Sequence, residues 1–131
     1  MNTNIKTADE KELRELDAWI AEYVMGAEWE VGRGNRNRLI LDGNVIFIRE
    51  RQELRAIGYH GKFNPSSDHA TAMQVLEKCI YVCCKDCKTV SIRKGADDFC
   101  VFARDHYDRE SAEAPTLPLA ICRFAQKLFT R

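Results

Sequence analysis

The sequence predicts an α+β fold, in which about three helices and two β-hairpins form a helix/antiparallel sheet/helix sandwich. Three observations favour this fold class. A long amphipathic segment follows the helix-start sequence at residues 64–68. Two further segments, one near each end of the chain, repeat apolar residues at helical spacing. Two turn sequences, at residues 42–43 and 94–98, each connect two segments with the composition of β-strands.

The central helix is expected to begin directly after Pro65-Ser66-Ser67-Asp68. Proline ends the preceding segment, and the three following side chains offer oxygens to the free N–H groups of a helix start. The apolar positions then fall on one stripe of a 3.6-residue period, which must pack on a sheet or on another helix. This stripe consists of Ala72, Met73, Leu76, Cys79 and Ile80.

The two outer helices are predicted by the same spacing. Thr7 and Glu10 have the spacing of a capping box, and Gly26 suits the end of the first helix. We expect residues 1–6 to be disordered. The last helix should begin at Pro115–Pro118. The apolar stripes are Leu13, Leu16, Trp19, Ile20, Tyr23 and Val24 in the first helix, and Leu117, Ile121, Phe124, Ala125 and Leu128 in the last.

The hairpins are predicted by their turns. Asp42-Gly43 tolerates the positive φ angles of a type I′ turn between residues 38–41 and 44–48. The second hairpin should pair residues 89–93 with residues 99–104. We expect residues 49–55 to form a short helix or an exposed connection, residues 57–59 another short strand, and the acidic segment 105–114 a surface loop.

Length and composition bound the class of protein. A chain of 131 residues, with 45% hydrophobic and 31% charged residues, fits a single domain spanning residues 1–131. The formal net charge is zero, which argues against direct nucleic-acid binding over the whole surface. No segment has the length of a membrane-spanning helix, so we expect a cytoplasmic protein with reduced cysteines and no membrane partner.

The segment Gly32–Arg38 holds three arginines, Arg33, Arg36 and Arg38, within a polar loop. It lacks the Gly-Lys-Ser/Thr ending of a P-loop and the glycine fingerprint of a dinucleotide-binding turn. Phosphate binding would therefore depend on the arginines alone. A solvated hairpin rim is the favoured interpretation, and contact with phosphate or nucleic acid is the alternative. If the protein has a specific partner, we expect the contact on this segment, because it is the main departure from neutral charge.

The other polar clusters also have simple structural explanations. Ser66, Ser67 and Asp68 are expected to cap the central helix first, and to form a rim for an anionic ligand second. The cysteines are expected to be small thiols without metal, because a structural zinc site usually needs a second close-spaced pair. If a metal binds, its ligands would come from Cys83, Cys84, Cys87 and Cys100, with Cys79 and His106 as further candidates. No cofactor and no catalytic residue is nominated, because none of the histidines lies beside a candidate nucleophile.

Several segments together resemble the phage ABA-sandwich domain family, a set of small phage and prophage proteins without established activity. They are residues 13–17, 24–26 and 29, the Pro-Ser-Ser-Asp sequence at 65–68, and the Pro-Leu-Ala-Ile-Cys-Arg sequence at 118–123. The resemblance covers residues 11–29 and 64–129, and implies a helix/sheet/helix sandwich. Residues 32–60 depart from it and are interpreted as a hairpin-bearing insertion.

The resemblance implies a function only in outline. We expect a phage- or prophage-encoded, non-catalytic binding protein in the bacterial host cell, a host-takeover or anti-defence inhibitor that sequesters or blocks a host protein or complex. The alternative is capture of a small phosphorylated ligand, such as a nucleotide, by Arg33, Arg36 and Arg38. A small nucleotide-acting enzyme is the alternative from another class, and an oligomer stays open.

Overall fold

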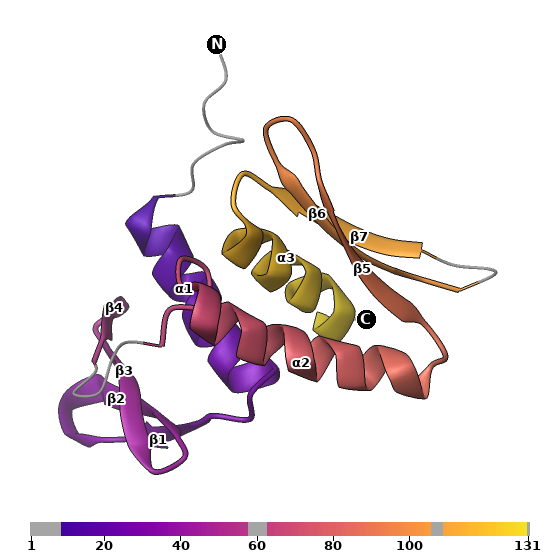
Figure 1. Ribbon diagram of the computed structural model, residues 1–131. Coiled ribbons are helices and arrows are strands. Elements are labelled where there is room, and N and C mark those ends of the chain that lie inside the picture. Colours follow the sequence, from indigo (N-terminus) through magenta and orange to yellow (C-terminus); the bar gives the residue numbers. More distant parts are fainter. Residues whose placement is uncertain (1–8, 58–62, 106–108, 131) are drawn as a thin grey trace.

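The structure of the protein, a computed structural model, describes residues 9–57, 63–105 and 109–130. These residues form three α-helices, a short 3₁₀ turn and two antiparallel sheets (Figure 1). The four-stranded sheet has the order β1-β2-β3-β4, and the three-stranded sheet has the order β5-β6-β7. The predicted α+β class is therefore confirmed, although the strands divide into two sheets.

Helix α1 (Glu10–Tyr23) begins two residues later than a cap at Thr7 would place it. Its N-cap is Asp9, whose side chain accepts a hydrogen bond of 2.7 Å from the backbone N–H of Glu12. Thr7 lies outside the described residues. The chain leaves the helix through Gly26 at φ +84°, as expected for a glycine at this end.

Helix α2 (His69–Lys85) extends beyond the expected apolar stripe and includes Cys83 and Cys84. Its buried residues are Ala72, Val75, Leu76, Cys79 and Cys83. Met73 is 46% exposed and Ile80 is 40% exposed, so their assignment to the buried stripe was wrong. Both the observed and the expected stripe contain residues 72, 76 and 79. The helix is rotated so that residues 75 and 83 complete the packed face.

Helix α3 (Leu117–Thr130) is the central element of the fold. It packs against α1, α2, β6 and β7. Ile121, Phe124, Ala125 and Leu128 are buried as expected. This broad contact explains why the last helix carries so many apolar residues.

The four-stranded sheet consists of β1 (Glu28–Val31), β2 (Arg36–Leu41), β3 (Asn44–Glu50) and β4 (Glu53–Ala56), with the 3₁₀ turn η1 (Arg33–Asn35) between β1 and β2. The β2–β3 turn has φ +52° at Asp42 and +81° at Gly43, which confirms the predicted hairpin. The prediction for residues 49–55 was wrong. Arg51 and Gln52, both at positive φ, form a second tight turn that leads into β4.

The three-stranded sheet consists of β5 (Thr89–Lys94), β6 (Phe99–Arg104) and β7 (Arg109–Ala114). The β5–β6 hairpin was expected. The surface loop expected at residues 105–114 is wrong over residues 109–114, because these residues pair with β6 as β7. The acidic segment has few β-formers, but its alternate residues Ala112 and Ala114 are buried.

One hydrophobic core joins the two sheets. It contains Leu39 and Phe47 from the first sheet, Val101 and Ala103 from the second, and the inner faces of the three helices. Leu16, expected to be fully buried, is half-buried at its edge. The interpretation of residues 32–60 as an insertion stays a prediction, as does the expected strand at 57–59, of which residues 58 and 59 lie outside the described residues. None of the described helices is both long and apolar enough to cross a membrane.

Candidate functional site

A groove with a volume of about 380 Å³ runs between α1 and the four-stranded sheet. Helix α1 contributes residues 15, 18, 19, 22 and 23, which form one stripe because they recur at helical spacing. The sheet contributes Trp29 from β1, Asn37 from β2 and Arg49 from β3. Asn37 and Arg49 are cross-strand neighbours, so their side chains share one face of the sheet. We call this hollow the aromatic groove.

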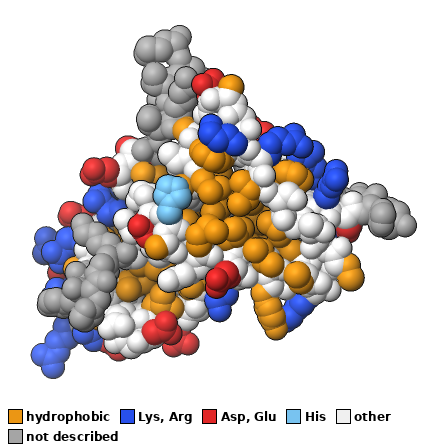
Figure 2. Space-filling view, in the orientation of Figure 1, with side chains coloured by type: hydrophobic (Ala, Val, Ile, Leu, Met, Phe, Trp, Pro, Cys, Tyr) orange, Lys and Arg blue, Asp and Glu red, His pale blue; other side chains and the backbone are white. Residues whose placement is uncertain are grey.

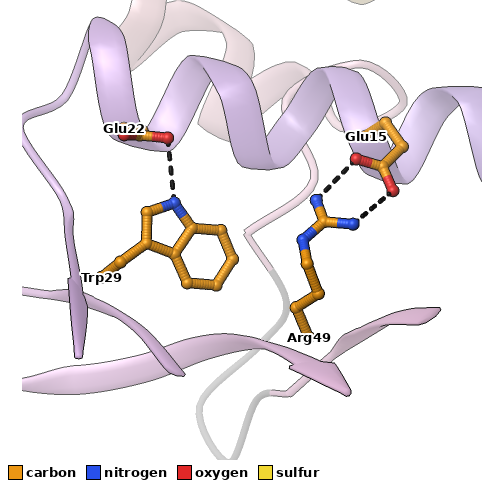
Figure 3. Close-up of polar contacts among 4 residues, drawn as sticks. All are labelled: Glu15, Glu22, Trp29 and Arg49. Atoms are coloured by element: carbon orange, nitrogen blue, oxygen red, sulfur yellow. Dashed lines mark hydrogen bonds and ion pairs between the residues drawn. The ribbon is translucent and has the colours of Figure 1, made fainter. Parts of the chain in front are cut away.

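The first polar contact across the groove joins Glu15 and Arg49 (Figure 3). The two guanidinium nitrogens of Arg49 donate hydrogen bonds of 3.1 and 2.7 Å to the two carboxylate oxygens of Glu15. This bidentate geometry fixes the planes of both groups. The hydrogen bonds from Arg49 lower the pKa of Glu15, and the same contact raises the pKa of Arg49. Both groups are therefore charged at neutral pH.

The second contact joins Trp29 and Glu22. The indole N–H of Trp29 donates a hydrogen bond of 2.9 Å to the carboxylate of Glu22 (Figure 3). The guanidinium carbon of Arg49 lies 5.7 Å from the centre of the Trp29 ring, within the range of a cation–π contact. Trp29 is thus held from two sides, and its ring position is set by contacts within the chain.

The aromatic surface continues along α1. The rings of Trp19 and Tyr23 lie with their centres 4.9 Å apart and their planes inclined by 35°. Tyr23 was expected in the core stripe of the first helix, but it is 55% exposed, and Trp19 and Trp29 are half-buried. A neighbouring hollow of about 540 Å³, between α1 and α3, shares Glu15 and Trp19 with the groove. The two hollows therefore adjoin at Glu15 and Trp19.

The three arginines predicted as binding residues lie on two different elements. Arg33 lies in the 3₁₀ turn, whereas Arg36 and Arg38 lie in β2. Arg38 forms an ion pair with Glu30 of β1, and Arg36 lies opposite Glu50 in β3. Because each strand arginine has an acidic neighbour, this face of the sheet has mixed charge and is not a basic patch.

Of the three predicted capping residues, only Asp68 caps α2. Its carboxylate accepts a hydrogen bond of 2.9 Å from the backbone N–H of Thr71 and another from the Thr71 hydroxyl. These contacts lower the pKa of Asp68. Ser67 is exposed in the preceding turn, where its N–H donates to the Asn64 carbonyl at 3.1 Å.

Ser66 is buried and has a different partner, Asp17 of α1. Its N–H and its hydroxyl donate hydrogen bonds of 2.8 and 3.0 Å to the two carboxylate oxygens of Asp17. Burial raises the pKa of Asp17 to about 6, although the bonds from Ser66 act in the opposite direction. Both residues line a hollow of about 390 Å³ with Arg14 and Arg55. The pair fixes the start of α2 against α1.

The candidate metal ligands are spread over the three-stranded side of the fold. Cys79 and Cys83 are buried in α2, Cys84 and Cys87 are exposed, and Cys100 is half-buried in β6. His106 lies outside the described residues. Within residues 9–57, 63–105 and 109–130, no three His, Cys, Asp or Glu side chains are placed to hold one metal ion.

Sequence reasoning missed the groove because its contacts connect distant segments. Glu15 and Arg49 are 34 positions apart. The spacing of residues 15, 19, 22 and 23 on one helix face is visible in the sequence, and it could have marked a mixed aromatic and acidic stripe. The arginine that pairs with this stripe could not be identified, because the strand and its register were not predicted beyond residue 48.

The fold and the groove define a small α+β sandwich with a preformed aromatic surface at one side. The phage ABA sandwich domain matches residues 18–125, and the chain belongs to this family. It is similar to the crystal structure of a phage protein from Bacillus cereus ATCC 14579, with a TM-score of 0.54 and 20% sequence identity over 95% of this chain and 97% of that chain. At this identity the similarity concerns the fold alone. No curated protein matches the chain.

Proposed function

We propose that this phage-family protein is a non-catalytic binding protein that blocks or sequesters a host protein through the aromatic groove. The observation that carries the proposal is the fixed arrangement of Trp29 and Arg49 beside the exposed Tyr23. Tryptophan, tyrosine and arginine are the residue types most enriched among those that dominate protein–protein binding energy.

The polar contacts of the groove support a protein partner for an energetic reason. Association costs free energy when flexible side chains are immobilised. Here Arg49 is already held by Glu15, and Trp29 by Glu22, so little further ordering is required. The two carboxylates also leave mixed charge around the rings. This mixture suits a partner that presents both apolar and polar groups, as a protein surface does.

The alternative, capture of a small phosphorylated ligand by Arg33, Arg36 and Arg38, has less support. Such a site needs several cations that converge on one anion. Arg38 already has Glu30 as its partner, and Arg36 lies opposite Glu50. A phosphate there would compete with these carboxylates and meet their repulsion.

Site-specific photo-cross-linking in phage-infected host cells tests the proposal. A photoreactive phenylalanine analogue replaces Tyr23 in one variant and Tyr81 in a second. Tyr81 is a matched control because it is a tyrosine of α2 with nearly the same exposure, 56% against 55%. We expect a discrete cross-linked host protein at position 23 and not at position 81. Equal products at both positions, or none at position 23, would contradict the proposal.

A further inference from the structure

The two edge strands of the three-stranded sheet differ in how their free backbone groups are covered. At β7, two cations of α3 reach the strand: Lys127 donates a hydrogen bond of 2.7 Å to the Ser111 carbonyl, and Arg123 donates one of 3.1 Å to the Glu113 carbonyl. Both carbonyls therefore point away from β6. Such coverage prevents a further strand from pairing at this edge.

The β5 edge has no such cover among the described residues. Near the turn, the N–H of Gly95 donates to the Asp98 carbonyl at 2.8 Å. Because hydrogen-bonded and non-hydrogen-bonded pairs alternate along an antiparallel ladder, this bond shows which residues of β5 are bonded to β6. Counting back along the register, Thr89, Ser91 and Arg93 exchange hydrogen bonds with β6. The N–H and carbonyl groups of Val90, Ile92 and Lys94 therefore face the open edge.

The inner side of this edge is apolar. Val90 and Ile92 lie opposite Ala103 and Val101, two buried residues, and so belong to the core-facing side of the sheet. Helix α3 packs on β6 and β7, and it does not extend over β5 to the same degree. Ile92 is consequently 44% exposed. In Figure 2, hydrophobic side chains gather into one patch over the region where α2, α3 and β5 lie in Figure 1.

We propose that the β5 edge binds the β5 edge of a second copy of this chain, so that two three-stranded sheets join into one continuous antiparallel sheet. The occupant is argued from the strand itself. A two-fold axis through Ile92 places Ile92 opposite Ile92 of the second copy and Val90 opposite Lys94. In this register the edge-facing backbone groups of each of these residues exchange two hydrogen bonds with the residue opposite.

Charge argues against a neighbouring register. With Ile92 on the axis, the cations Arg93 and Lys94 face Ser91 and Val90 of the second copy, both uncharged. A shift that places Ser91 on the axis would set Lys94 against Lys88, and like charges directly opposite are destabilising. The contact is self-complementary, and the covered β7 edge prevents addition of further copies, so assembly closes at two.

Two variants that place opposite charges at position 92 test this dimer. Wild-type protein should have twice the chain mass by light scattering at high micromolar concentration. Ile92→Lys and Ile92→Glu should each be monomeric, with a dimer dissociation constant raised at least tenfold, because like charges then meet on the axis. An equimolar mixture of the two variants should restore a dimer that contains one chain of each kind, detected by native mass spectrometry.

Val31→Lys is the matched control, because Val31 is an 81% exposed apolar residue on an edge strand of the other sheet. This variant should remain dimeric. Far-ultraviolet circular dichroism verifies that each variant is folded. A monomeric wild type, a dimer that persists in Ile92→Lys, or a mixture that stays monomeric would overturn the proposal. None of these results bears on the aromatic groove, which lies on the other sheet.

Discussion

Asp17 is the residue whose environment most affects the dependence of stability on pH. The residue is 4% exposed, and burial raises its pKa from 3.8 to about 6. Between these values the unfolded chain ionises while the folded protein keeps its proton. The free energy of unfolding should therefore fall as pH rises from 4 to 6, by about 2 kcal/mol from this group alone. Glu15 and Asp68, whose pKa values are lowered, act in the opposite direction.

Asp17→Asn isolates this contribution. Urea unfolding at a series of pH values gives the difference in free energy between variant and wild type. Because the variant cannot ionise at this position, the difference should shift in its favour by about 2 kcal/mol between pH 4 and pH 7. A difference that is constant over this range would show that Asp17 has an ordinary pKa.

The cysteines should separate into two classes by reactivity. Cys84 and Cys87 are exposed, whereas Cys79 and Cys122 are buried. Burial raises the pKa of Cys79 to about 12 and also raises that of Cys122, so neither forms the reactive thiolate at pH 8. Alkylation of the native protein followed by peptide mass spectrometry should label Cys84 and Cys87 first. Labelling of Cys122 at the same rate would contradict the packing of α3.

At the scale of elements, α2 provides a direct comparison between its two faces. Leu76 is 5% exposed, and Leu76→Ala should lower the free energy of unfolding by about 3 kcal/mol through lost burial and a residual cavity. Ile80 is 40% exposed, and Ile80→Ala should change it by less than about 0.5 kcal/mol, because alanine also favours the helix. Chemical denaturation measures both. Equal losses would mean that the helix is rotated toward the face first expected from the sequence.

The β3–β4 turn offers a stabilising change. Arg51 and Gln52 have φ angles of +51° and +73°, which cost free energy for residues with a Cβ atom. Replacing them by Asn-Gly should raise the free energy of unfolding by about 1 kcal/mol. Gly43→Ala in the other turn is the comparison and should lower the free energy of unfolding by about 1 kcal/mol. Gly43 has φ +81° and no atom lies within 4 Å of an added Cβ, so only the backbone conformation opposes alanine. A destabilised Asn-Gly variant would refute this turn.

Elements with strong local sequence signals were predictable, and elements that depend on neighbouring strands or helices were not. The three helices and the Asp42-Gly43 hairpin follow from spacing and turn chemistry. Strand β7 could not be predicted, because Arg-Glu-Ser-Ala-Glu-Ala has little β-propensity and depends on pairing with β6 and on α3. Strand β4 was missed because its turn, Arg51-Gln52, lacks the usual glycine or asparagine.

At the scale of the whole molecule, the two proposed binding surfaces lie on different sheets. The four-stranded sheet and α1 hold the aromatic groove, and the three-stranded sheet offers the β5 edge to a second copy. A dimer joined at β5 would carry two grooves, so a partner with two binding sites, or an oligomeric one, would be held more tightly than by a single groove. The family and the fold were recognisable from the sequence. The positions of the groove and of the open β5 edge were not, because they depend on which strand edge and which helix face the rest of the chain leaves uncovered.

Titration calorimetry with the purified host partner tests the central claim most directly. Tyr23→Ala removes an exposed ring of the aromatic groove without touching the Glu15–Arg49 or Glu22–Trp29 contacts, and Tyr81→Ala removes an equally exposed ring from α2. We predict that Tyr23→Ala weakens binding at least tenfold, which is about 1.4 kcal/mol, while Tyr81→Ala stays within about twofold of wild type. Equal affinities for the two variants would contradict a binding site at the groove.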